Sequence, residues 1–122
     1  RIVDVYMRAY RKKRLKLYLL FLIKIMEDIM QEKYIEKKLV AAVKDMGGIA
    51  LKFVSPGVDG VPDRIVLLPM GRMAFVECKA TGKKMRPIQE KRKKQLEALG
   101  FSVYCLDSVG QIGGILSEIQ ST

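Results

Sequence analysis

Two acidic residues and a lysine of this 122-residue chain are spaced so that their side chains can meet: Asp63, Glu77 and Lys79. Two carboxylates on neighbouring strands repel each other unless a cation lies between them. Oxygen ligands of this kind suit Mg²⁺ or Mn²⁺ better than Zn²⁺. The three residues therefore predict a divalent-metal site with a lysine beside it.

A β-hairpin must bring these side chains together. Residues 63–68 and 72–79 are β-type runs that flank Pro69-Met70-Gly71, which is typical of a three-residue hairpin loop. In that register Asp63 lies directly opposite Glu77, with the Cβ atoms about 5 Å apart. Alternation along the strand then places Lys79 on the same face as Glu77. A two-residue loop, Met70-Gly71, would shift the register by one and separate the carboxylates, but methionine is a poor occupant of a position that needs a positive φ.

Composition excludes several other chemistries. The chain has no histidine, which rules out a histidine base, a histidine zinc ligand and Ser-His or Cys-His nucleophiles. Its two cysteines lack CxxC spacing, so a reduced, cytoplasmic protein with buried free thiols is expected. The length allows one ordinary domain. The net charge of +10 points to a polyanionic partner, either nucleic acid or an anionic membrane surface.

The positive charge is concentrated in two places. Residues 1–25 carry eight basic residues and one acidic residue, and residues 79–94 also carry eight and one. The apolar run 17–23 superficially resembles a signal peptide. It is far shorter than the roughly 20 residues of a membrane span, and no small-residue cleavage site follows it. Residues 1–29 are therefore interpreted as an extension, either outside the natural reading frame or an oligomerisation helix, and residues 30–122 as the functional domain.

The remaining elements predict an α/β fold. Apolar spacing indicates a helix over residues 30–46, and β-type runs indicate strands at 49–54 and 101–106 besides the hairpin. Residues 87–99 and 108–120 have helical patterns. The helix at 87–99 connects two strands as a crossover, so the order αβββαβα predicts a mixed central sheet flanked by helices. Glu36 lies at the edge of the inward stripe of the first helix, which favours its joining the same site.

The ordered motifs resemble the VRR-NUC family, a branch of the PD-(D/E)XK nuclease superfamily. They are Tyr34-Ile35-Glu36, Lys52-Phe53-Val54-Ser55-Pro56-Gly57, Gly60-Val61-Pro62-Asp63-Arg64, Phe75-Val76-Glu77-Cys78-Lys79 and Gln89, within about residues 32–110. The resemblance implies a restriction-endonuclease-like αβββαβ core that hydrolyses DNA phosphodiesters with Mg²⁺. Small freestanding members resemble phage enzymes that act as homodimers on branched DNA such as Holliday junctions.

Roles follow from the spacing together with the resemblance. Asp63, Glu77 and the backbone carbonyl of Cys78 are expected to hold the metal, and Lys79 to act on the attacking water or on the phosphate charge. The resemblance adds Glu36 as a further metal or water ligand and Gln89 as a contact to phosphate or water. DNA-backbone contacts are expected from the following residues: Ser55, Lys83, Lys84, Arg86 and Lys91.

Two other function classes remain open from the sequence. A DNA-binding module without catalysis would keep the positive charge, but it has no use for an aspartate facing a glutamate. A membrane-surface protein is supported only by residues 1–25. A homodimer is expected because one core of this size makes one cut, whereas a two-stranded substrate needs two.

Overall fold

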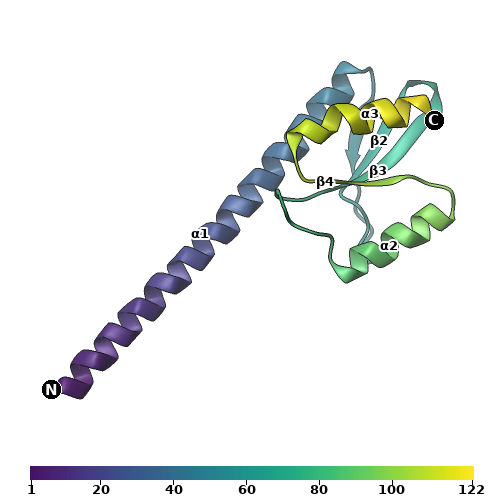
Figure 1. Ribbon diagram of the computed structural model, residues 1–122. Coiled ribbons are helices and arrows are strands. Elements are labelled where there is room, and N and C mark those ends of the chain that lie inside the picture. The colour runs from purple at the N-terminus through teal and green to yellow at the C-terminus, as the bar shows by residue number, and fades with distance from the viewer. The chain divides into compact units, whose positions relative to one another are not determined.

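The computed structural model describes residues 1–122 as three helices and one four-stranded sheet (Figure 1). The elements are α1 (Ile2–Asp45), β1 (Ile49–Lys52), β2 (Arg64–Leu68), β3 (Arg72–Cys78), α2 (Pro87–Ala98), β4 (Val103–Leu106) and α3 (Ile112–Ser121). Short 3-10 turns occupy Pro69–Gly71 and Val109–Gln111. The elements follow the predicted order, although the first helix begins at Ile2 and not near residue 30.

The chain divides into two compact units, Arg1–Met30 and Gln31–Thr122. The first unit consists of the N-terminal part of α1, and the apolar side chains of residues 17–23 are exposed there. No helix of the chain has both the length and the apolar content that a bilayer crossing requires. The second unit contains the sheet, both other helices and every predicted site residue.

The sheet is mixed, as the sequence predicts. Its strand order is β1-β2-β3-β4, with antiparallel pairing from β1 to β3 and parallel pairing between β3 and β4. The parallel pair requires a crossover, which α2 provides. In the β2–β3 hairpin, Leu68 pairs with Arg72 and Arg64 with Val76. Continuing this register places Asp63 opposite Glu77, so the three-residue loop is confirmed.

One residue of the hairpin loop has an unexpected backbone conformation. Met70 has φ 70° and ψ 24°, a left-handed conformation, and the following Gly71 has φ 73°. The expectation that methionine avoids a positive φ is therefore wrong at this position. A left-handed conformation costs a non-glycine residue about 1–2 kcal/mol, and the Met70 side chain is 89% exposed. The register is fixed by the burial of Val66 and Leu68 on one sheet face, which outweighs this local strain.

The hydrophobic core lies between one face of the sheet and two helices. Residues Ile35, Leu39 and Val43 recur every four positions along α1 and are fully or almost fully buried. The α3 side chains that join this core are Ile112, Leu116 and Ile119, and the sheet contributes Ala50, Val66, Leu68, Ala74, Val76, Cys78 and Leu106. No α2 residue belongs to this core, because α2 lies on the other side of the sheet (Figure 1).

Candidate active site

Asp63 is fixed at the end of the hairpin where β2 begins. Its Oδ2 atom accepts a hydrogen bond from the backbone N–H of Cys78 at 2.9 Å. Its backbone carbonyl accepts the N–H of Phe53 at 2.8 Å. Asp63 is thus held between the chain that follows β1 and the end of β3, and its carboxylate lies beside Glu77.

Glu77 is the most buried charged residue of the site, with 1% of its surface exposed. Its Oε2 atom lies 3.0 Å from Lys79 Nζ and also accepts a hydrogen bond from Gln89 Nε2. Its Oε1 atom is buried and has no hydrogen-bond partner. Burial, followed by the negative charge of Asp63, raises the pKa of Glu77 from 4.5 to about 7, although Lys79 opposes the shift. Glu77 is therefore partly protonated at neutral pH, and a further cation beside it would favour its ionised form.

Glu36 reaches the site from α1 and is held by two basic side chains. Its Oε1 atom lies 3.0 Å from Arg64 Nη2 and 3.3 Å from Lys52 Nζ. Arg64 also donates a hydrogen bond from Nη1 to the carbonyl of Ala50 at 3.1 Å. The partly buried guanidinium therefore joins α1 to the sheet and sets where the Glu36 carboxylate lies.

Candidate ligand atoms from α1, from the residue before β2 and from the end of β3 come together here. Potential ligand atoms of Glu36, Asp63 and Cys78 lie within 4.8 Å of one another. Burial raises the pKa of the Cys78 thiol far above neutrality, which keeps it protonated within the core and makes its sulfur a poor ligand. The donors that remain in this group are the carboxylates of Glu36 and Asp63, and Glu77 beside Asp63 has a buried oxygen without a partner, so the residues fit Mg²⁺ or Mn²⁺.

Gln89 joins the site from α2, as expected of a residue in the second helix. It is buried, and its Oε1 atom accepts the backbone N–H of Arg86 at 2.8 Å while its Nε2 atom donates to Glu77. Both ends of its amide are used within the protein. Gln89 therefore links the first turn of α2 to the Glu77 carboxylate, and its contact with phosphate or water stays a prediction.

The cations expected to contact DNA are exposed on α2 and on the segment before it. Lys83, Lys84 and Arg86 lie on the segment that follows Lys79, and Lys91 lies in the second turn of α2. Ser55 is half-buried, and its carbonyl accepts the N–H of Val58 at 3.2 Å, which closes a turn.

The segment that carries these cations is hydrogen-bonded to two other parts of the chain. Thr81 Oγ1 donates to the carbonyl of Asp107 at 2.8 Å, and the N–H of Gly82 donates to Asp107 Oδ2 at 3.2 Å. The N–H of Thr81 donates to Gln31 Oε1 on α1 at 3.0 Å. Gln31 and Asp107 thus fix the backbone at Thr81 and Gly82, between Lys79 and α2.

The loop before β2 packs closely against α2, and a glycine in it allows this close approach. A Cβ atom at Gly60 would lie 2.6 Å from the carbonyl oxygen of Ile88, and Gly60 has φ +79°. Arg92 Nε donates to the carbonyl of Asp59 at 2.9 Å. The loop that contains Ser55 is therefore fastened to the same helix that carries Gln89.

Sequence reasoning missed the second layer of the site. Arg64 follows Asp63 directly in the motif, but no role was inferred for it, and Lys52 was likewise overlooked. Glu32 lies one helical turn before Glu36, and burial and the charge of Asp63 raise its pKa. The spacing of four residues was the available signal, since it places Glu32 on the same helix face as Glu36.

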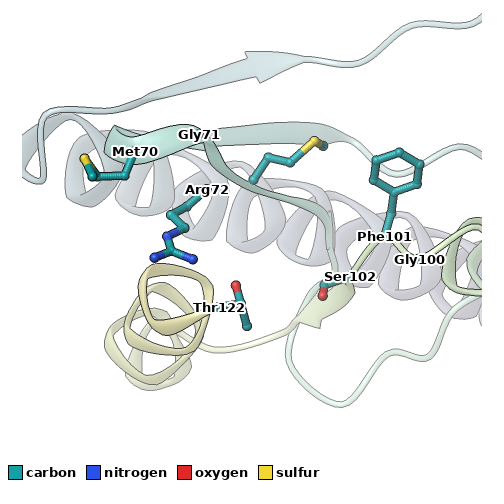
Figure 2. Close-up of a pocket in the computed structure, with 8 residues that line it drawn as sticks. Met70, Gly71, Arg72, Gly100, Phe101, Ser102 and Thr122 are labelled. Carbon is teal, nitrogen blue, oxygen red and sulfur yellow. The ribbon is translucent and has the colours of Figure 1, made fainter.

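A hollow at the opposite end of β3 is not part of this site. Figure 2 shows its lining, which includes Met70, Arg72, Phe101 and Thr122 but no acidic residue. Without carboxylates it offers no place for the predicted metal.

The fold and the carboxylate cluster define a nuclease, and comparisons with known proteins agree. No family model matches the chain. The phage protein named "Putative nuclease p44", from Acyrthosiphon pisum secondary endosymbiont phage 1, is 55% identical over 80 residues, which cover 66% of this chain and 86% of that protein. A solved structure described as a VRR_NUC domain superposes with a TM-score of 0.67 at 27% identity, covering 71% of this chain and 95% of that one. The chain belongs to the VRR-NUC family of nucleases.

Proposed function

We propose that the protein is a Mg²⁺-dependent endodeoxyribonuclease that cuts branched DNA, of which a Holliday junction is the type, as a homodimer. The observation that carries the metal dependence is the buried Oε1 atom of Glu77, which has no partner and lies on a carboxylate whose pKa is raised to about 7. A divalent cation held by Glu77 and Asp63 would supply the missing partner and add positive charge to that of Lys79.

The metal ligands in this proposal come from the hairpin and from α1. Asp63, Glu77 and the carbonyl of Cys78 would hold the ion, and Glu36 would bind it or a water molecule from the helix. When bound, Mg²⁺ supplies a Lewis acid that neutralises the charge on the scissile phosphate and on the leaving oxygen. Arg64 and Lys52 hold Glu36 by its Oε1 atom, which leaves Oε2 for the ion or for a water molecule.

Lys79 is the proposed catalytic residue of the chain. Its ammonium group lies 3.0 Å from Glu77 Oε2, and its side chain is 13% exposed. An ammonium at this place orients the attacking water by a hydrogen bond and stabilises negative charge that develops on the phosphate. Glu77 in turn holds Lys79 in position, so the pair is more than a surface ion pair.

Recognition of the DNA backbone is assigned to the exposed cations before and along α2. Lys83, Lys84, Arg86 and Lys91 belong to one continuous stretch that begins four residues after Lys79. Contacts of this kind bind phosphates without reading bases. Selectivity for branched DNA then rests on the shape of the substrate and on the distance between two active sites in the homodimer.

The test uses four DNA substrates of the same length: linear, nicked, flapped and four-way. We expect cleavage of the four-way junction in Mg²⁺ or Mn²⁺, weaker cleavage of linear DNA and none in EDTA. Cleavage in EDTA would contradict the metal dependence. Equal rates on linear and four-way DNA would contradict the selectivity, and binding to all four without cleavage would leave only a DNA-binding module.

A further inference from the structure

A hollow of about 240 Å³, called here the α1 hollow, lies beside the carboxylate cluster on the flank of α1. Four of its five lining residues come from two turns of that helix, and the fifth is the first residue of β2. They are Lys33, Glu36, Lys37, Val40 and Arg64. Three of the five are cations, so the lining is positively charged although it adjoins a predicted metal site.

The two lysines of the α1 hollow have no role in holding the fold together. Lys33 and Lys37 are four residues apart on α1, which places both ammonium groups on the same side of the helix. Both side chains are exposed, and neither belongs to an ion pair of the chain. Like charges at this spacing weaken a helix slightly. The pair therefore adds positive charge to this surface without a gain in stability.

Two further cations stand where the sheet meets this flank of the helix. Lys52 ends β1 and Arg64 begins β2, and the two residues pair across the strands. Both contact the same oxygen, Glu36 Oε1, at 3.3 and 3.0 Å. Glu36 is thus shared between them and does not neutralise both. With Lys33 and Lys37, four cations face this carboxylate.

The α1 hollow is joined to the metal site through Glu36. A ligand atom of Glu36 lies within 4.8 Å of one of Asp63, and Glu32 also lies close to both residues. These carboxylates repel a phosphate in the metal-free protein. A divalent ion held by Asp63 and Glu77 would offset their charge, so we expect the hollow to attract an anion most strongly when the metal is bound.

We propose that the α1 hollow binds a phosphate of the DNA strand beside the one that is cut. The inference rests on the nuclease of the proposed function and adds α1 to its DNA-binding surface. A DNA strand carries one phosphate for about every 3.4 Å of helix axis. When one phosphate lies at the metal, a neighbouring phosphate is therefore within reach of Lys33 and Lys37.

The α1 hollow and the cations already assigned to DNA lie on different sides of the active site. α1 packs on the core face of the sheet, whereas α2 lies on the other side (Figure 1). The cations of residues 83–91 precede α2 or belong to it. A strand that crosses the site between these faces meets cations both before and after the metal. Contacts on both sides of the scissile phosphate hold it in place for attack.

The test measures binding of a four-way junction in Ca²⁺ over a range of salt concentrations. We expect the double variant Lys33→Gln with Lys37→Gln to bind at least about tenfold more weakly and to lose about two phosphate contacts from its salt dependence. Its cleavage rate in Mg²⁺ at saturating DNA should stay within about threefold of the wild type, because neither lysine touches the reacting atoms. Both positions are exposed, so circular dichroism should show an unchanged fold.

Lys44→Gln is the matched control. It removes the same charge from the same helix, but Lys44 lies exposed in the last turn of α1. The glycine that closely follows, Gly47, packs near Pro69 of the hairpin loop, at the other end of the sheet. We expect Lys44→Gln to bind the junction as the wild type does. Wild-type affinity of the double variant would overturn the proposal, as would an equal loss per lysine in Lys44→Gln, which would reduce the effect to net charge.

Lysine acetylation read by mass spectrometry gives a second measurement, on the wild-type chain. Bound DNA should protect Lys33 and Lys37 from the acetylating reagent and leave Lys44 reactive. Equal reactivity of Lys33 and Lys37 with and without bound DNA would overturn the proposal. Neither readout needs cleavage, so a chain that binds DNA through these lysines and does not cut it would refute the proposed function and leave the contact at α1 standing.

Discussion

Replacing Glu77 by glutamine should make the metal-free protein more stable at pH 8. In the folded state the pKa of Glu77 is raised to about 7, from 4.5, mainly by burial and by the charge of Asp63. The folded state therefore binds this proton more tightly than the unfolded state does. It follows that Glu77 lowers stability progressively as the pH rises from about 4.5 to about 7.

The difference between these two pKa values sets the size of the loss in the free energy of unfolding. It corresponds to at most about 3 kcal/mol, fully expressed above pH 7 and absent below about pH 4.5. Glutamine has no charge to desolvate and keeps an oxygen that can accept the hydrogen bond from Gln89. We therefore expect Glu77→Gln to unfold about 10 °C higher than the wild type at pH 8 in EDTA, with little difference at pH 4.5.

Thermal unfolding by circular dichroism at pH 4.5, 6, 7 and 8 measures this directly. Glu90→Gln, at an exposed position of α2, is the matched control and should follow the wild type. Added Mg²⁺ should raise the melting temperature of the wild type and leave that of Glu77→Gln nearly unchanged. A stability difference that is the same at every pH would refute the reasoning, since it would owe nothing to the ionisation of Glu77.

Four further variants separate the roles of neighbouring groups. Lys79→Ala should lower the single-turnover cleavage rate by about two orders of magnitude with little change in DNA affinity in Ca²⁺. Lys84→Ala should instead weaken DNA binding and reduce its salt dependence by about one phosphate contact. The reverse pattern would mean that Lys84 is the catalytic lysine and Lys79 a phosphate contact. Arg64→Ala should free Glu36 and lower the cleavage rate at saturating DNA, and normal turnover would remove Arg64 from the site. Asp107→Ala should weaken DNA binding several-fold while the salt slope stays unchanged, because it releases the backbone at Gly82 and removes no cation; stronger binding would mean that Asp107 only repels DNA.

The central part of the fold could be predicted from the sequence because local signals agreed there. The stripe of Ile35, Leu39 and Val43 indicated the α1 face that packs on the sheet, and Pro69-Met70-Gly71 with its flanking β-type runs indicated the hairpin. The register followed from the loop length, and with it the position of Asp63 opposite Glu77. The left-handed Met70 shows the limit of that reasoning, because burial along β2 outweighed a local preference.

The second layer of the site was beyond sequence reasoning because it depends on how distant elements meet. Arg64 pairs with Glu36 across 28 residues, and Gln31 contacts Thr81 across 50. Neither spacing has a period that a sequence pattern could reveal. Gln89 was identified, but its contacts to Glu77 and to the N–H of Arg86 follow from the docking of α2 on the sheet, which no local signal describes.

The central claim is that the carboxylates of the hairpin hold a divalent metal for DNA cleavage, and Asp63→Ala tests it most directly. The measurement is single-turnover cleavage of a four-way junction in Mg²⁺, paired with binding of the same junction in Ca²⁺. We predict that Asp63→Ala binds the junction within about threefold of the wild type and cuts it at least about a thousandfold more slowly. Near-normal cleavage by Asp63→Ala would contradict the claim that the hairpin carboxylates hold a metal for cleavage.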